Sequence, residues 1–166
     1  SGIVPDIMSL AKGLGGGFPI GACLSTRSAA FGMTPGAHGS TFGGNPLAGA
    51  VANAVLDIVM DDALLAEIQR KGALLHGLLQ DVAGRYPEVI VEVRWRGTML
   101  VIKTTLPSPE IAEALRARAK VLTIAAGDNV TRVLPPLIVT DEEIRLFAER
   151  CEEVFAHLSK RATQGT

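Results

Sequence analysis

The chain has 166 residues, with 16 basic and 17 acidic side chains, 48% apolar residues and only 4% aromatic residues. This length and apolar content suffice for one ordinary domain or two small ones, which argues against intrinsic disorder. A formal charge of −1, without a run of basic residues, gives no surface that would attract nucleic acid or an anionic membrane. No apolar stretch reaches the roughly 18 residues of a membrane-spanning helix. The two cysteines suggest neither a disulfide framework nor a zinc site, and no metal-ligand spacing is present. We therefore predict a cytoplasmic protein without a bound metal.

Glycine is concentrated in the first 50 residues. This segment holds 12 of the 18 glycines but only three charged side chains, Asp6, Lys12 and Arg27. Because the segment also carries many apolar residues, we interpret it as packed backbone rather than as a flexible linker. Glycine in such a setting permits tight turns, or a close approach of the main chain to another group.

Two short apolar segments and two loops precede a long helical pattern. We predict a buried strand or turn over residues 7–11, a loop over 12–19, an apolar strand over 20–25 and a loop over 32–45. From Pro46 to Val82 apolar residues recur at helical spacing. Asp61 and Asp62 mark either a break in this pattern or a new helix N-cap.

The second half of the chain alternates between strands and helices. We predict strands over residues 89–93, 99–102, 121–124 and 130–134, and a helix over residues 108–119. Gly97 falls at the turn between the first two strands. Thr140 and Glu143 form a capping box that opens a last helix. From about residue 87 onward, the pattern indicates a compact α+β unit.

Lys12 is the only lysine among the first 70 residues, and it precedes a run of glycines. An ordinary surface lysine at the edge of a loop is one interpretation. The other is a reactive amine whose pKa is lowered by burial, because only the neutral amine attacks a carbonyl carbon to form a Schiff base. No Gly-Lys-Ser/Thr sequence follows, so the lysine does not belong to a Walker A phosphate loop.

Ser40 and Thr41 lie in a second glycine-rich loop, just before the helix that starts near Pro46. Hydroxyl and backbone N–H groups at the start of a helix are able to bind a phosphate. On these residues alone, an ordinary turn that caps the helix is the favoured alternative.

Arg132 is a lone cation in the apolar segment 130–136. A guanidinium group in such a place suits bidentate binding of a carboxylate. A salt bridge to a nearby acidic side chain is the alternative.

Three segments together resemble one family. Residues 5–22, with the sequence PDIMSLAKGLGGGFPIGA, resemble the lysine motif of class III, pyridoxal-phosphate-dependent aminotransferases. Residues 38–48 and 127–138 are similar to the branch of this family that acts on N-acetylornithine. The resemblance runs from about residue 3 to residue 158, with the three segments in the same order as in the family.

The resemblance implies a set of roles in an enzyme whose cofactor is pyridoxal phosphate. Lys12 would form a Schiff base with the cofactor and then move a proton between substrate and cofactor. Thr41 would bind the cofactor phosphate and Ser40 would lie near the substrate, both reaching the site of the neighbouring subunit in a homodimer. Arg132 would hold the α-carboxylate of glutamate or 2-oxoglutarate.

The resemblance also implies an α/β fold, namely the C-terminal part of a fold-type-I aminotransferase. Residues 1–60 would end the large cofactor-binding domain, residues 61–86 would form a connecting helix, and residues 87–166 would form the small C-terminal α+β domain. Family members are considerably longer and carry upstream the phosphate-binding turn, the stacking aromatic ring and the Asp that pairs with the ring nitrogen. We therefore expect the isolated chain to be catalytically incompetent, or nearly so.

The implied reaction is transamination of N-acetylornithine with 2-oxoglutarate, a step of arginine biosynthesis. One alternative is another ω-amino donor, such as ornithine, succinylornithine, succinyldiaminopimelate or 4-aminobutyrate. A second alternative, from a different class, is a non-catalytic remnant that acts as an interaction module.

Overall fold

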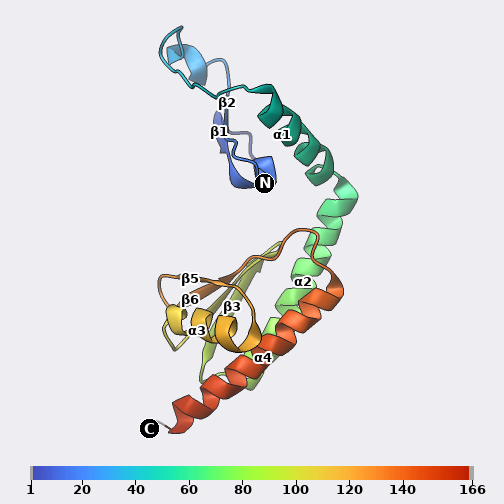
Figure 1. The fold of residues 1–166 in the computed structure, drawn as a ribbon, viewed down its shortest axis with the longest axis vertical. Coiled ribbons are helices and arrows are strands. Elements are labelled where there is room, and N and C mark those ends of the chain that lie inside the picture. Colours follow the sequence, from blue (N-terminus) through green and yellow to red (C-terminus); the bar gives the residue numbers. More distant parts are fainter. Residues whose placement is uncertain (1, 165–166) are drawn as a thin grey trace. The chain divides into compact units, whose positions relative to one another are not determined.

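A computed structural model describes residues 2–164 of the chain, with side chains described through Arg161 (Figure 1). The chain divides into two compact units, Ser1–Leu64 and Leu65–Thr166. Within the described residues, no helix combines the length and the apolar character needed to cross a membrane. The same residues contain no group of three or more His, Cys, Asp or Glu side chains placed to hold a metal ion.

The first unit contains a two-stranded antiparallel ribbon and a helix. Its elements in order are β1 (Ile7–Leu10), a 3-10 turn (Lys12–Gly15), β2 (Ala22–Ser25), a second 3-10 turn (Ala29–Gly32) and α1 (Pro46–Val59). The two strands pair with Ile7 opposite Ser25 and Leu10 opposite Ala22. The sequence therefore located both strands and the start of the helix.

The expected burial of the first strand is wrong for this chain. Ile7 is 59% exposed and Met8 is 41% exposed, and all four residues of β2 are exposed as well. A two-stranded ribbon buries a face only when another layer packs on it. The described residues of this unit supply no such layer, so the apolar residues that suggested burial face outward.

A break separates the two long helices. α1 ends at Val59 and α2 covers Asp62–Arg85. Between them, the Oδ1 atom of Asp61 accepts hydrogen bonds from the backbone N–H groups of Ala63 and Leu64, at 2.7 and 3.3 Å. Asp61 thus caps the second helix, and the structure has both the break and the new N-cap that the sequence offered as alternatives.

The second unit is built on a four-stranded antiparallel sheet with the strand order β3-β4-β6-β5. Its elements after α2 are β3 (Ile90–Arg96), β4 (Met99–Thr104), α3 (Ser108–Ala114), a π-helical turn (Leu115–Ala119), β5 (Ile124–Ala126), β6 (Val130–Val133) and α4 (Asp141–Gln164). Gly97, with a φ of +56°, turns the chain between β3 and β4 as expected.

One strand lies further along the chain than predicted. The apolar run over residues 121–124 suggested a strand, but β5 begins only at Ile124. Pairing across the turn at Asp128 and Asn129 fixes this position, because Ala126 lies opposite Val130 and Ile124 lies opposite Arg132. The ladder therefore starts where β6 provides partners, rather than where the apolar run starts.

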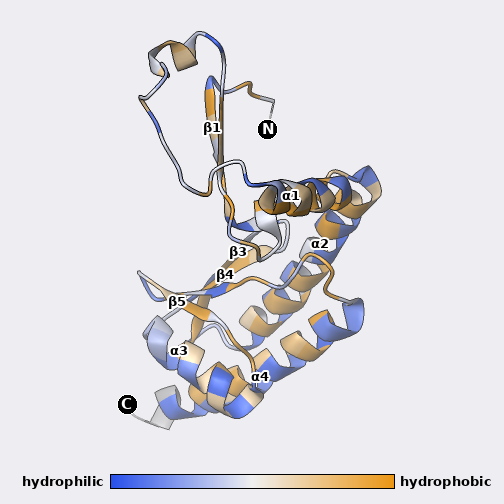
Figure 2. Ribbon diagram, turned by 45° about the horizontal axis from the view of Figure 1, so that its top comes forward, coloured by the Kyte–Doolittle hydropathy of each residue, from blue (hydrophilic) through white to orange (hydrophobic). Residues whose placement is uncertain are grey.

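The core of the second unit lies between one face of the sheet and the helices α2, α3 and α4. Its fully buried side chains include Leu79 of α2, Ile102 of β4, Ile111 of α3 and Phe155 of α4. Figure 2 shows that α2 and α4 each have an apolar side and a polar side. The capping box of α4 is confirmed, because Glu143 Oε2 accepts from the Thr140 backbone N–H and Thr140 Oγ1 accepts from that of Glu143, at 2.8 and 3.2 Å.

Candidate functional site

Lys12 begins the 3-10 turn Lys12–Gly15, which we call the lysine turn, and Ala11 alone separates it from the end of β1. Its backbone has a φ of +53°, a left-handed conformation that costs a residue with a Cβ atom about 1 kcal/mol or more. Such strained residues cluster at functional sites, where the surrounding structure holds them in place. The side chain is exposed. The apolar surroundings expected around the amine are thus not provided by the described residues.

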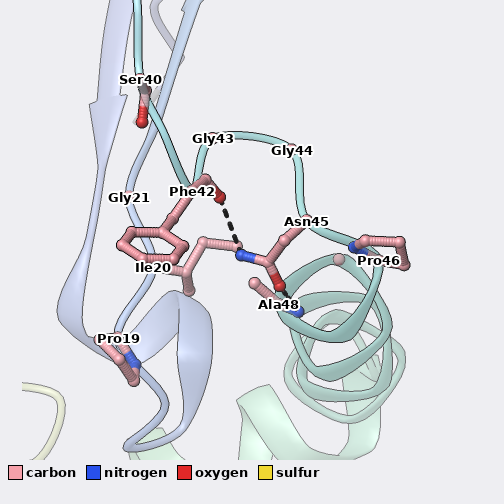
Figure 3. A pocket seen from close by; sticks show the side chains of 11 residues that line it. Pro19, Ile20, Gly21, Ser40, Phe42, Gly43, Gly44, Asn45, Pro46 and Ala48 are labelled. Carbon is pink, nitrogen blue, oxygen red and sulfur yellow. Dashed lines mark hydrogen bonds between the residues drawn. The ribbon is translucent and has the colours of Figure 1, made fainter.

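Ser40 and Thr41 lie in the loop between the second 3-10 turn and α1, and both are exposed. Ser40 borders a hollow of about 480 Å³, whereas Thr41 and Lys12 do not (Figure 3). The hollow is lined by residues 19–21, Ser40, residues 42–46, Ala48 and Gly49. The loop therefore comes together with the end of the lysine motif, residues 19–21.

Asn45 caps α1, a role that was not predicted from the sequence. Its Oδ1 atom accepts from the Ala48 backbone N–H and its Nδ2 atom donates to the Phe42 carbonyl oxygen, both at 2.9 Å (Figure 3). The cap occupies a backbone donor at the start of the helix that a phosphate would otherwise use. If this loop binds a phosphate, the Ala48 N–H is not available as a donor while the Asn45 cap is in place, whereas the hydroxyl groups of Ser40 and Thr41 are exposed. Asn-Pro before a helical pattern was the signal for this cap.

Gly43 allows the loop to fold closely around Ser40. A Cβ atom at Gly43 would lie 2.9 Å from the Cβ atom and 3.0 Å from the Oγ atom of Ser40. A side chain at this position would force the serine to move. The glycine thus keeps the serine hydroxyl beside the hollow.

Arg132 is exposed on β6, and its side chain forms no ion pair or hydrogen bond within the described part of the chain. The acidic side chains of β3 and of the turn between β5 and β6 already form ion pairs. Glu92 lies 3.5 Å from Arg94, and Asp128 lies 2.7 Å from Lys103, whose hydrogen bond holds the pKa of the Asp128 carboxyl below its ordinary value. The salt bridge considered as an alternative for Arg132 is therefore absent among these residues. A guanidinium without a protein partner is available to an external carboxylate.

The two units divide the candidate residues between them. Lys12, Ser40 and Thr41 belong to the first unit and Arg132 belongs to the second. Together they offer a primary amine, two hydroxyl groups and a guanidinium. Such a set is able to form a Schiff base, to bind a phosphate and to hold a carboxylate.

Comparison with known sequences establishes the family. The sequence model of the family described as "Aminotransferase class-III" matches residues 1–155, so the chain belongs to this family. An acetylornithine aminotransferase of Mesorhizobium japonicum is 54% identical over 144 residues, covering 87% of this chain and 36% of that protein. Acetylornithine aminotransferase 1 of Bradyrhizobium diazoefficiens is 51% identical over 164 residues, covering 99% of this chain and 40% of that protein.

Solved structures agree with this assignment. The acetylornithine aminotransferase of Elizabethkingia anophelis matches with a TM-score of 0.84 and 31% identity, over 94% of this chain and 40% of that one. An ornithine aminotransferase of Toxoplasma gondii, described with partial occupancy of pyridoxal phosphate at its active site, matches with a TM-score of 0.85 and 32% identity, over 96% of this chain and 38% of that one. The fold is thus that of part of a class III aminotransferase. The chain spans about two fifths of the length of the relatives it matches.

Proposed function

We propose that this chain carries the lysine and the carboxylate-binding arginine of an aminotransferase that moves the terminal amino group of N-acetylornithine to 2-oxoglutarate. The observation that carries the proposal is the identity of about half of the residues with acetylornithine aminotransferases, and the match that covers 99% of this chain spans both Lys12 and Arg132. In this proposal, residues 1–60 form the end of the large domain. Residues 61–86 form the helix that connects it to the small domain, which consists of residues 87–166.

The residues present fit part of a pyridoxal phosphate site. Lys12 offers a primary amine on a strained, hydrogen-bonded turn, and Ser40 and Thr41 offer exposed hydroxyl groups. Phosphate oxygens accept hydrogen bonds from such hydroxyl groups. Asp6 belongs to the lysine motif itself and is not the acid that would pair with the ring nitrogen.

The side chains of this chain would each have a separate role in binding the cofactor, orienting the substrate or transferring a proton. Lys12 Nζ would hold the cofactor covalently, and as a free amine it would transfer a proton at the substrate carbon that bears the amino group. Arg132 fixes the α-carboxylate of glutamate or 2-oxoglutarate through paired N–H donors, which orients the reacting carbon. Thr41 donates to the cofactor phosphate, and Ser40 lies near the substrate. Pyridoxal phosphate, when bound, supplies the electron sink for this chemistry.

We propose further that the enzyme is a homodimer whose site is shared, with Ser40 and Thr41 reaching the neighbouring subunit. The exposure of both side chains supports this, because each is free to contact another chain. The same arrangement would explain why Thr41 and Lys12 do not border the hollow beside Ser40 in one chain.

A chimera gives the test. Residues 1–166 replace the 164 aligned residues of the Bradyrhizobium diazoefficiens relative, which supplies the remaining parts of the fold. The amino donors are N-acetylornithine, ornithine, succinylornithine, succinyldiaminopimelate and 4-aminobutyrate, each with 2-oxoglutarate as acceptor. We expect the highest kcat/KM with N-acetylornithine and none with the Lys12→Ala chimera. A higher kcat/KM with another donor would assign that substrate instead, and an inactive but folded chimera would favour the non-catalytic remnant.

A further inference from the structure

Gly16, the residue that caps the C-terminal end of the lysine turn, lies close against α1. A Cβ atom built at Gly16 would lie 2.9 Å from the Cγ2 atom of Val55, closer than real Cβ contacts come. A Cβ atom at Gly15 would lie 2.7 Å from the Cγ2 atom of Ile20, on the segment that leaves the turn. The turn is therefore held between a helix side chain and its own following segment, all within the first unit.

Hydrogen bonds connect this contact to Lys12. The Leu14 backbone N–H donates to the Ala11 carbonyl at 3.2 Å, and the Gly16 N–H donates to the Gly13 carbonyl at 3.1 Å. Lys12 lies between the first donor and its acceptor. Because these two overlapping turns share the short segment from residue 11 to residue 16, a displacement of Gly16 is transmitted to Lys12 rather than absorbed by a flexible loop.

The Val55 side chain has little conformational freedom to move away from Gly16. It is half-buried on a regular helix, where β-branched side chains are confined almost to one χ1 rotamer. Gly16 in turn has a φ of +54°, a conformation that glycine adopts without strain. A Cβ atom added at Gly16 would thus meet a helix side chain that has little freedom to move.

We propose that Val55 is a positioning residue for Lys12. Its contact with Gly16 fixes the position of the lysine turn relative to α1, and this in turn fixes the position of the Lys12 amine. The proposal rests on the proposed role of Lys12 as the residue that binds the cofactor. Val55 itself touches neither substrate nor cofactor in this account. It acts through the packing of Gly16 and through the turn hydrogen bonds.

The test uses the chimera with bound pyridoxal phosphate and a pair of compensating substitutions. Gly16→Ala adds the colliding Cβ atom, and Val55→Ala removes the Cγ2 atom that it meets. We expect Gly16→Ala to lower kcat by about 100-fold, since a misplacement of about 1 Å at a reacting group costs this much. Adding Val55→Ala to it should restore kcat at least about tenfold. Gly36→Ala is the matched control, because its φ of +85° is also positive and nothing lies within 4 Å of the built Cβ atom.

A second readout separates positioning from loss of structure. The absorbance of the bound cofactor, titrated with pH, reports the surroundings of the Lys12 amine independently of turnover. We expect its midpoint to shift in Gly16→Ala and to return toward the original value in the double variant. Gly36→Ala and Ile58→Ala, a truncation of a residue 60% exposed on the same helix, should leave the midpoint unchanged.

The outcomes distinguish this inference from the proposed function. If peptide mapping of the borohydride-reduced parent chimera finds no label on Lys12, the proposed function fails and the inference fails with it. If the label is on Lys12 but Val55→Ala gives no recovery of either readout, the inference alone is wrong. Should Gly16→Ala prevent folding, Val55→Ala by itself decides: we expect a three- to tenfold lower kcat with a shifted midpoint, and unchanged values would overturn the inference.

Discussion

Among the glycines of the second unit, Gly72 of α2 is the one whose replacement by alanine should lower the free energy of unfolding most. A Cβ atom built there would lie 2.1 Å from the carbonyl oxygen of Gly97, at the turn between β3 and β4. It would also lie 3.2 Å from a ring carbon of Trp95. An ordinary carbon–oxygen contact is about 3.3 Å or longer, so the turn would have to retreat by about 1 Å.

The expected loss follows from two opposing effects of Gly72→Ala. Forcing an extra carbon into a packed site costs about 1–3 kcal/mol, and the upper end applies because the atom in the way is backbone. Alanine in a helix recovers about 0.5–1 kcal/mol relative to glycine. The net loss is therefore about 2 kcal/mol of unfolding free energy. With a urea m-value of about 2 kcal/mol/M, the unfolding midpoint should fall by about 1 M.

Gly77 of the same helix provides a matched control, because nothing lies within 4 Å of a Cβ atom built there. Gly77→Ala should raise the midpoint by a few tenths of a molar. Trp95, the single tryptophan and stacked on His76, reports the unfolding of this unit by fluorescence. A Gly72→Ala chain as stable as Gly77→Ala would refute the close approach of α2 to the turn.

Three further predictions concern charge and accessibility. In the chimera, Arg132→Met should raise the KM for 2-oxoglutarate about 10- to 100-fold, since a hydrogen-bonded charge pair is lost; an unchanged KM would remove Arg132 from the site. Hydrogen bonding to Arg70 holds the pKa of Asp141 below its ordinary value of 3.8, so this stabilisation is present above about pH 4 and is lost as pH falls through the lowered pKa. Arg70→Met should therefore lower stability near pH 7, and the difference from the parent chain should shrink toward pH 3 in urea titrations. Burial raises the pKa of the Cys151 thiol, whereas Cys23 is exposed. A thiol reagent should therefore modify only Cys23 in the native chain and both cysteines in denaturant. Two fast-reacting thiols in the native chain would contradict the packing of α4.

Local signals made much of the fold predictable. The predicted capping box at Thr140 and turn at Gly97 are confirmed, and Asp61 forms the N-cap that the sequence offered as one alternative, because each feature depends on residues only a few positions apart. The lysine motif likewise placed Lys12 between two strands. The family followed from the same motif, and the comparisons confirm it.

Features that depend on pairing or on tertiary contact were not predictable. The start of β5 depends on which residues of β6 pair with it, and the apolar run before Ile124 does not indicate the register of that pairing. Whether the Arg132 side chain has a salt-bridge partner depends on tertiary positions that the sequence does not report, and two acids of the same sheet pair with Arg94 and Lys103 instead. The contact between Gly16 and Val55 joins residues 39 positions apart, and no local pattern reports such a contact.

The central claim is that Lys12 is the lysine to which pyridoxal phosphate binds, and covalent trapping tests it most directly. The chimera is loaded with pyridoxal phosphate, reduced with borohydride and digested, and the labelled peptide is identified by mass spectrometry. Among the lysines of this segment, we predict one label per chain, on Lys12, and its loss in Lys12→Ala. A label absent from Lys12, or spread over Lys71, Lys103, Lys120 and Lys160, would contradict the claim.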